Sequence, residues 1–171
     1  MNRGTAPFRG RIRALLPGGQ NPLARLSERL ALYWEFSRPF TLVAPALGML
    51  SGGFTAFGAH PRETFALHHL VHIGLGTLMA AVLNAASNGI NQVYDLTNDR
   101  VNKPRRPVPS GRLSEKEAMI VSYVWFAIAL LLAALVNWQC FALAFAATVF
   151  TWAYSAPPLR TKRRGLWSNI T

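Results

Sequence analysis

The sequence predicts an all-α protein: an integral membrane helical bundle with about four transmembrane helices. Hydrophobic residues make up 51% of the 171 residues and charged residues only 15%. Long uncharged stretches recur along the chain, and 18 Lys and Arg residues stand against 7 Asp and Glu residues. This composition excludes a disordered chain, which would be poor in large apolar residues. The single cysteine, Cys140, excludes an intrachain disulfide framework and a Cys-based metal cluster.

Four stretches are long and apolar enough to form helices across the roughly 30 Å hydrocarbon core of a bilayer. Three of them carry no charge over 19 or 20 residues: Pro39–Gly58, Ala118–Val136 and Trp138–Ala156. The remaining stretch, about Leu67–Val93, is apolar but holds asparagines near its end. Pro45 predicts a kink in the first helix, and the Pro157-Pro158 pair is expected to end the last one.

The basic residues predict the orientation of these helices. All but one of the 18 Lys and Arg residues lie before the first stretch, between residues 100 and 116, or after residue 159; the exception is Arg62. Positively charged loops stay in the cytoplasm, so both termini are expected there, in a protein of the cell inner membrane. The charge also favours anionic lipid headgroups. Because it flanks apolar runs instead of lining one polar face, no nucleic acid is expected as a partner.

Residues 1–36 are interpreted as a basic cytoplasmic segment, and residues 37–171 as the membrane domain. The first segment lacks the apolar core of a signal peptide. Around Leu23–Phe36, the residues Leu26, Leu30 and Trp34 share one helical face. That pattern predicts an amphipathic helix lying on the membrane surface.

A polar stripe runs along the end of the second apolar stretch. Asn84, Asn88, Asn91 and Asp95 are spaced by four, three and four residues, and Asp99 follows one turn later. On a helix this spacing places all five side chains on one face. Polar groups at membrane depth usually face a cavity or a partner. Because oxygen ligands suit Mg²⁺, which also shares substrate phosphate oxygens, the stripe predicts a magnesium site that opens to the cytoplasm.

The segment that follows the stripe is basic and rich in proline. Lys103, Arg105, Arg106 and Arg112 lie among three prolines and a glycine, which predicts a rigid, non-helical loop. Cations beside metal-binding carboxylates are the usual means of holding a diphosphate. Alternatively, these residues are ordinary positive flanks beside solvated helix-end acids. The adjacent asparagine stripe favours the diphosphate site.

Residues 91–99, Asn-Gln-Val-Tyr-Asp-Leu-Thr-Asn-Asp, fit the pattern N-x-x-x-D-x-x-x-D of the UbiA superfamily of intramembrane prenyltransferases. The strings at 37–41, 102–111 and 154–160 also resemble that family, in the same order along the chain. From about Trp34 onward, the chain therefore resembles the N-terminal portion of such an enzyme.

The resemblance implies Mg²⁺-dependent transfer of an isoprenyl group from a prenyl diphosphate to a lipophilic or aromatic acceptor. Asp95, Asp99 and Asn91 would form the catalytic metal site. The residues implied at the diphosphate are Arg38, Lys103, Arg106 and Asn88. Tyr94 and Tyr154 would contact the prenyl chain or its cation, or else be interfacial tyrosines. The strings look closest to members that act on glycerol-phosphate lipids, chlorophyllides or homogentisate, and hydroxybenzoate-type acceptors stay open.

Members of this family are built from about nine helices and carry a second Asp-rich cluster. Here Ala118–Thr171 contains no Asp or Glu. The chain is therefore expected to be part of a larger fold: a fragment, a truncated frame, or half of a split enzyme whose second chain supplies the rest. Alone, it is expected to lack transferase activity.

Two other functions remain open. One is a non-catalytic membrane fragment or assembly subunit. The other, a CDP-alcohol phosphotransferase, should show a D-G-x-x-A-R string, which the sequence lacks. His68, His69 and His72 have a spacing that can bind zinc, but without a nearby acid or Cys they are expected to be interfacial histidines.

Overall fold

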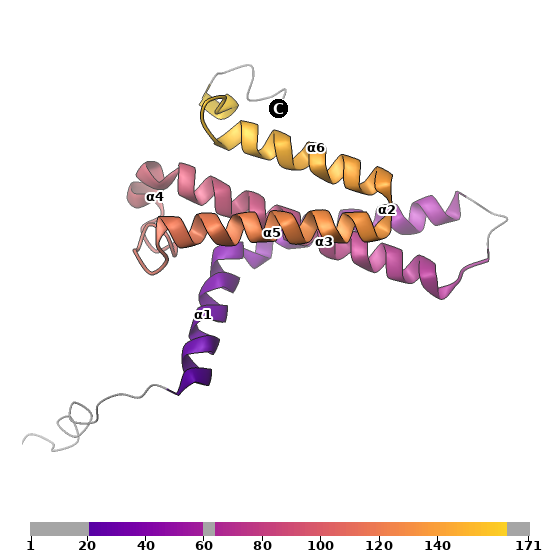
Figure 1. The fold of residues 1–171 in the computed structure, drawn as a ribbon, viewed down its shortest axis with the longest axis horizontal. Coiled ribbons are helices and arrows are strands. Elements are labelled where there is room, and N and C mark those ends of the chain that lie inside the picture. Colours follow the sequence, from indigo (N-terminus) through magenta and orange to yellow (C-terminus); the bar gives the residue numbers. More distant parts are fainter. Residues whose placement is uncertain (1–20, 60–63, 164–171) are drawn as a thin grey trace, which may run out of the picture. The chain divides into compact units, whose positions relative to one another are not determined.

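The computed structural model describes residues 21–59 and 64–163. Regular structure in these residues is entirely helical (Figure 1), which confirms the all-α prediction. The elements are α1 (Pro22–Ser37), α2 (Pro39–Gly58), α3 (Leu67–Tyr94), α4 (Leu96–Asn102), α5 (Glu115–Val136), α6 (Trp138–Ser155) and the 3₁₀ turn η3 (Thr161–Arg163). The arginines before residue 20 and Arg62 lie outside the described residues.

The chain divides into two compact units, Met1–Ala31 and Leu32–Thr171. The first unit includes the beginning of α1, and every site described below lies in the second. Helix α1 covers the predicted amphipathic segment, and Leu26, Leu30 and Trp34 are all more than half exposed. Its place on a membrane surface stays a prediction.

Three helices are long and apolar enough to cross a membrane by length and composition: α2, α3 and α5. Helix α2 runs through Pro45 without interruption and has no buried residue of its own. The fourth expected span forms the 18-residue helix α6, which is not among those three. Its passage through the membrane therefore stays a prediction.

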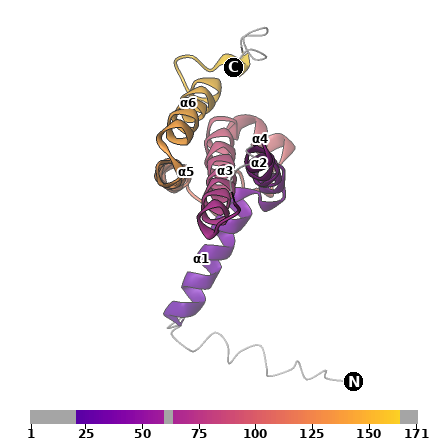
Figure 2. The same cartoon turned by 90° about the vertical axis from the view of Figure 1, so that its right-hand side faces the viewer.

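Helix α3 is the centre of the second unit. It contacts α2, α5 and α6, and Figure 2 shows it between α2 and α5. Gly89 lies where α3 approaches α5 closely: a Cβ atom there would lie 2.1 Å from Ser122 Oγ and 3.0 Å from Phe36 Cζ. The missing side chain thus lets α3 and α5 meet and lets Phe36 pack against them. The Phe36 ring stacks on Trp125, with 5.5 Å between the ring centroids.

The basic loop between α4 and α5 consists of turns, as its prolines predict. Val108 and Leu113 are 4% and 1% exposed, and they pack with Phe36 in one core cluster. Gly111 has a φ of 76°, which glycine adopts without strain. The loop is therefore anchored by apolar side chains, a feature that its charge pattern did not indicate.

The polar stripe continues across the break between α3 and α4. Asp95 belongs to neither helix, yet its N–H donates to the Asn91 carbonyl at 2.9 Å, and the Asp99 N–H donates to the Asp95 carbonyl at 2.9 Å. These bonds continue the helical pattern of hydrogen bonds between residues four apart across the break. As a result, Asn91, Asp95 and Asp99 reach the same pocket.

Candidate functional site

A charged pocket of about 230 Å³ lies where α3, α4 and the basic loop meet the segment after α6. Its lining residues are Arg38, Asn91, Gln92, Asp95, Asp99, Lys103, Arg106, Tyr154 and Lys162. Seven of the nine residues that the sequence singled out therefore come together here. Four separate parts of the chain contribute, so the pocket is a product of the tertiary fold.

Asp99 is the more buried of the two acids, with a side chain only 7% exposed. Arg106 Nη1 lies 2.6 Å from its Oδ2 atom, and Lys103 Nζ lies 3.8 Å from its Oδ1 atom. A buried carboxylate needs such partners, because an uncompensated charge is costly out of water. The basic loop thus places two positive charges beside Asp99.

Asp95 is paired with a different part of the chain. Lys162 Nζ lies 2.7 Å from its Oδ1 atom, and Arg160 Nη2 lies 4.0 Å from the same oxygen. Lys162 Nζ makes no hydrogen bond, so its contact with Asp95 is an ion pair. Arg160 also donates to the Tyr94 carbonyl and is fixed with a φ of 41°.

Lys162 and Arg160 are site residues that the sequence pattern left among the positive flanks. Their spacing from the Pro157-Pro158 pair carries no periodic signal, because no helix links them to α6. Only the return of the chain after α6 brings them to Asp95. The one sequence signal that could have indicated these two site residues is the cluster of basic residues after the prolines.

Asn91 faces the pocket and is held by α6. Its side-chain oxygen accepts a hydrogen bond from the Ser155 hydroxyl. Tyr154, the neighbour of Ser155, also lines the pocket. The resemblance at residues 154–160 therefore corresponds to a contact between α6 and the polar stripe.

Arg38 enters the pocket from the junction of α1 and α2. It has φ 58° and ψ 64°, a left-handed conformation that is strained for a residue with a side chain. Burial and the nearby Arg106 guanidinium lower the pKa of Arg38, and Asp99 opposes them. It remains a cation at neutral pH, since an arginine side chain starts from a very high pKa.

Two predicted residues lie elsewhere. Tyr94 packs beside the core residues Ala86, Ile90 and Phe126, and it is not among the pocket-lining residues. Asn88 is buried and bonds to the α1–α2 junction instead of lining the pocket. Its direct contact with a diphosphate stays a prediction.

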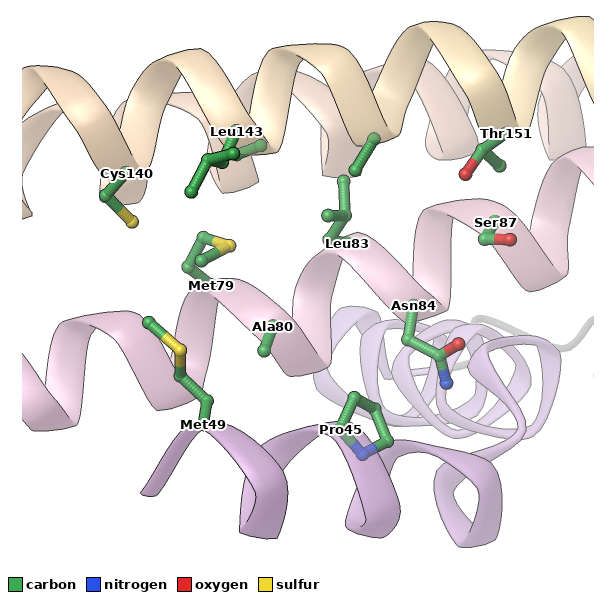
Figure 3. A pocket seen from close by; sticks show the side chains of 12 residues that line it. Pro45, Met49, Met79, Ala80, Leu83, Asn84, Ser87, Cys140, Leu143 and Thr151 are labelled. Atoms are coloured by element: carbon green, nitrogen blue, oxygen red, sulfur yellow. The ribbon is translucent and has the colours of Figure 1, made fainter. Parts of the chain in front are cut away.

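An apolar groove extends from the charged pocket between α3 and α6. The part nearest the charges is lined by Ser87, Asn91, Ala147, Phe150, Thr151 and Tyr154. The next part, a cavity of about 400 Å³, shares Ser87, Ala147 and Thr151 and continues to Met49, Met79 and Leu143 (Figure 3). The pockets therefore adjoin one another, and their lining changes from charged to mainly apolar side chains.

The donor set at the charged end suits a hard divalent cation. Asp95 and Asp99 offer carboxylate oxygens and Asn91 an amide oxygen, and all three line one pocket. Such oxygens are the ligands of Mg²⁺, which completes its shell with waters and phosphate oxygens. Across the described ranges, no group of three or more His, Cys, Asp or Glu side chains could hold a metal ion, and this set has only two acids.

In the histidine cluster near the start of α3, His68 and His72 are exposed and His69 is half-buried. The rings of His68 and His69 lie 3.9 Å apart, and His69 contacts Phe57 and Phe65. Its Nδ1 atom accepts from the Ala66 N–H at 3.1 Å.

Comparison with known proteins identifies the family of this chain. Residues 40–171 match the model of the UbiA prenyltransferase family. The chain is 34% identical over 125 residues to a digeranylgeranylglyceryl phosphate synthase of Methanopyrus kandleri, covering 72% of this chain and 42% of that protein. It is 33% identical over 137 residues to the bacteriochlorophyll synthase 33 kDa chain of Cereibacter sphaeroides, covering 78% and 42%.

A solved structure shares the fold. It is described as digeranylgeranylglyceryl phosphate synthase in membranes, and it matches with a TM-score of 0.64 and 24% identity. The match covers 81% of this chain and 47% of that one. The chain thus spans less than half the length of the relatives it resembles.

Proposed function

Because this chain belongs to the UbiA prenyltransferase family, we propose that it binds a prenyl diphosphate and takes part in transferring the prenyl group to a lipophilic or aromatic acceptor in a membrane. One observation carries the proposal: a pocket with two acids and four cations opens onto an apolar groove. A prenyl diphosphate has the same division between a charged head and a long apolar chain.

The charged residues divide into two sets. Asp95, Asp99 and Asn91 would hold Mg²⁺, which supplies positive charge to the diphosphate oxygens when bound. Arg38, Lys103, Arg106 and Lys162 would bind the remaining oxygens; arginine can do so with two parallel hydrogen bonds. The cations now paired with the acids would thus exchange a carboxylate for a phosphate partner.

This charge favours departure of the diphosphate. When the allylic C–O bond breaks, its electron pair leaves with the diphosphate, and the cationic side chains stabilise that charge. The acceptor then forms the new bond to the prenyl carbon and loses a proton. Tyr154 lies where the pocket meets the groove, so its ring would face the developing carbocation.

The groove between α3 and α6 would hold the prenyl chain. Its walls are mainly apolar, and its far end is formed by the flexible side chains of Met49 and Met79. Burial of each methylene group is worth about 0.8 kcal/mol, so the tail would supply much of the affinity.

The charge pattern supports a position in the cell inner membrane with both termini in the cytoplasm. The described loop 103–114 and the segment after α6 carry three of the pocket's four cations. Both would then face the cytoplasm, the side from which a soluble diphosphate can enter. Anionic lipids would contact the same basic surface.

We propose that a further part of the fold, in the same chain or a second one, completes the acceptor site. The share of each relative that is matched supports this. A glyceryl phosphate lipid is the first acceptor to test, because several relatives are named as synthases of a digeranylgeranylglyceryl phosphate.

The test is binding of a prenyl diphosphate to the chain in lipid nanodiscs, measured by calorimetry. We expect binding that requires Mg²⁺ and is lost with EDTA, and much weaker binding of the matching prenyl alcohol. Equal affinity for the alcohol and the diphosphate would overturn the proposal. A transfer assay with a panel of acceptors runs in parallel, and turnover by the chain alone would show that no further part is needed.

A further inference from the structure

Three amide side chains on α3 bind the junction of α1 and α2. Asn84, Asn88 and Gln92 are spaced by four residues and so share one face of the helix. Gln92 Nε2 donates to the Phe36 carbonyl at 2.9 Å, and Asn88 Nδ2 donates to the Ser37 carbonyl at 3.1 Å. Asn84 Nδ2 donates to the Thr41 carbonyl at 2.8 Å. We call these three residues the amide ladder.

Each acceptor is a carbonyl that helix geometry leaves without its usual partner. Phe36 and Ser37 are the last residues of α1, where carbonyls lack an intrahelical donor. Thr41 lies four residues before Pro45, which has no N–H to donate. The amide ladder therefore supplies hydrogen bonds at the places where the chain turns from α1 into α2.

Arg38 lies between these bonded carbonyls. Its own carbonyl accepts from the Thr41 N–H at 2.8 Å and from the Thr41 hydroxyl at 2.9 Å. Asn88 Nδ2 also donates to that hydroxyl oxygen at 2.8 Å. The left-handed backbone of Arg38 is thus held on both sides, which offsets its strain.

Asn88 alone in the ladder also touches the Arg38 side chain. Its Oδ1 atom accepts from Arg38 Nη1 at 3.4 Å, a long hydrogen bond. The position of Oδ1 is set by the two shorter bonds of the same amide group, since these fix which end carries the NH₂ group. Asn84 makes similar bonds to Thr41 without a bond to the guanidinium.

We propose that Asn88 is a positioning residue that aims the Arg38 guanidinium into the charged pocket. This inference rests on the proposed function only for the ligand that Arg38 meets there. We expect this ligand to be an oxyanion, because a fixed guanidinium is pre-organised for phosphate oxygens. A long bond to a neutral amide leaves the remaining N–H groups available to that ligand.

The first experiment is a double-mutant cycle on the full chain in nanodiscs. Inorganic diphosphate with Mg²⁺ is titrated into the wild type, Arg38→Ala, Asn88→Ala and the double variant. Loss of one charge-assisted contact is expected to weaken binding about tenfold in Arg38→Ala, and Asn88→Ala about threefold or more. The double variant should bind like Arg38→Ala alone, because Asn88 acts through the arginine.

Asn84→Ala is the matched control, since it removes bonds to the same junction but no contact with Arg38. It is expected to lower the melting temperature while keeping the diphosphate affinity. The inference falls if Asn88→Ala weakens binding equally with and without Arg38, because that is the result of a purely structural role. It also falls if the single variant Asn88→Ala binds diphosphate with the same affinity as the wild type.

A second measurement needs no diphosphate binding. Phenylglyoxal modifies accessible guanidinium groups, and mass spectrometry reports the rate at Arg38. We expect Asn88→Ala to raise this rate and Asn84→Ala to leave it unchanged, with exposed Arg112 as the internal reference. If the wild type binds no diphosphate, the proposed function fails, while an unchanged Arg38 rate in Asn88→Ala refutes the positioning role.

Discussion

Arg106 and Asp99 form an ion pair of 2.6 Å across the turn that follows α4. Both side chains are largely buried, with exposures of 21% and 7%. Each therefore depends on the other, since a buried charge without a partner is unfavourable. The pair keeps the proposed metal-binding acid and the proposed phosphate-binding cation next to each other.

Asp99→Asn is expected to weaken binding of a divalent cation about tenfold or more, because it replaces a charged oxygen ligand with a neutral one. Mn²⁺ serves as the probe for Mg²⁺, and electron paramagnetic resonance measures the free ion. Glu115→Gln is the control, since Glu115 is an exposed acid that lies 3.6 Å from Arg100. Equal Mn²⁺ affinities in the wild type and Asp99→Asn would argue against the metal site.

Gly89→Ala is expected to lower the stability of the helical bundle by about 1–3 kcal/mol, the usual cost of overpacking. The new Cβ atom would lie 2.1 Å from Ser122 Oγ. Thermal unfolding in detergent, followed by circular dichroism, measures the change. Gly74→Ala in the same helix is the control, because a Cβ atom there meets nothing within 4 Å. Adding Ser122→Ala should restore part of the loss, and no such rescue would contradict the packing argument.

The pair of Glu35 and Arg112 predicts a small pH dependence of stability. Arg112 donates to both Glu35 carboxylate oxygens, at 2.7 and 2.6 Å. This bonding, opposed in part by burial, lowers the pKa of Glu35 below its ordinary value of 4.5. The folded state therefore holds the proton more weakly than the unfolded state. The stabilisation is present above the unfolded pKa and is lost as the pH falls through the folded pKa.

Glu35→Gln should remove this part of the dependence. Both side chains are nearly half exposed, so the expected contribution is at most about 1 kcal/mol. Melting temperatures of the wild type and Glu35→Gln are compared from pH 7 to pH 3. The two curves should converge at acid pH, and a constant separation would contradict the assignment.

Ala147→Trp is expected to separate tail binding from head binding. Ala147 lies on α6 and lines both parts of the apolar groove but not the charged pocket. A bulky ring there should weaken a long prenyl diphosphate at least about tenfold through lost apolar burial, with little change for inorganic diphosphate. Calorimetry on both ligands measures the difference. Ala142→Trp, an exposed position of the same helix outside the groove, should affect neither ligand.

Much of the fold and part of the site could be predicted from the sequence. Helix periodicity and uncharged length predicted the apolar helices, and the spacing of Asn91, Asp95 and Asp99 predicted their common face. Such signals are local, because they depend on residues a few positions apart. Lys162 reaches Asp95 only through the tertiary path of the chain, so no local pattern could reveal it.

Asn88 shows a different limit of sequence reasoning. The family resemblance implies a diphosphate contact for Asn88, and that contact stays a prediction. The sequence does not indicate that Asn88 bonds to the Ser37 carbonyl, Thr41 and Arg38. Every residue has a backbone carbonyl, so the sequence does not show which carbonyls will need a side-chain donor. The hydrogen bonds that a broken helix requires are visible only once both helices are placed.

The amide ladder also bears on how this junction can be exchanged between proteins. Its three carbonyl acceptors, at Phe36, Ser37 and Thr41, are backbone atoms that any residue offers, whereas all three donors are side chains on α3. The geometry of the α1–α2 junction is thus encoded in a distant helix. A chimaera that imports residues 34–41 from a relative should keep the arginine in place as long as α3 retains its amides, whereas transplanting the junction without them should not.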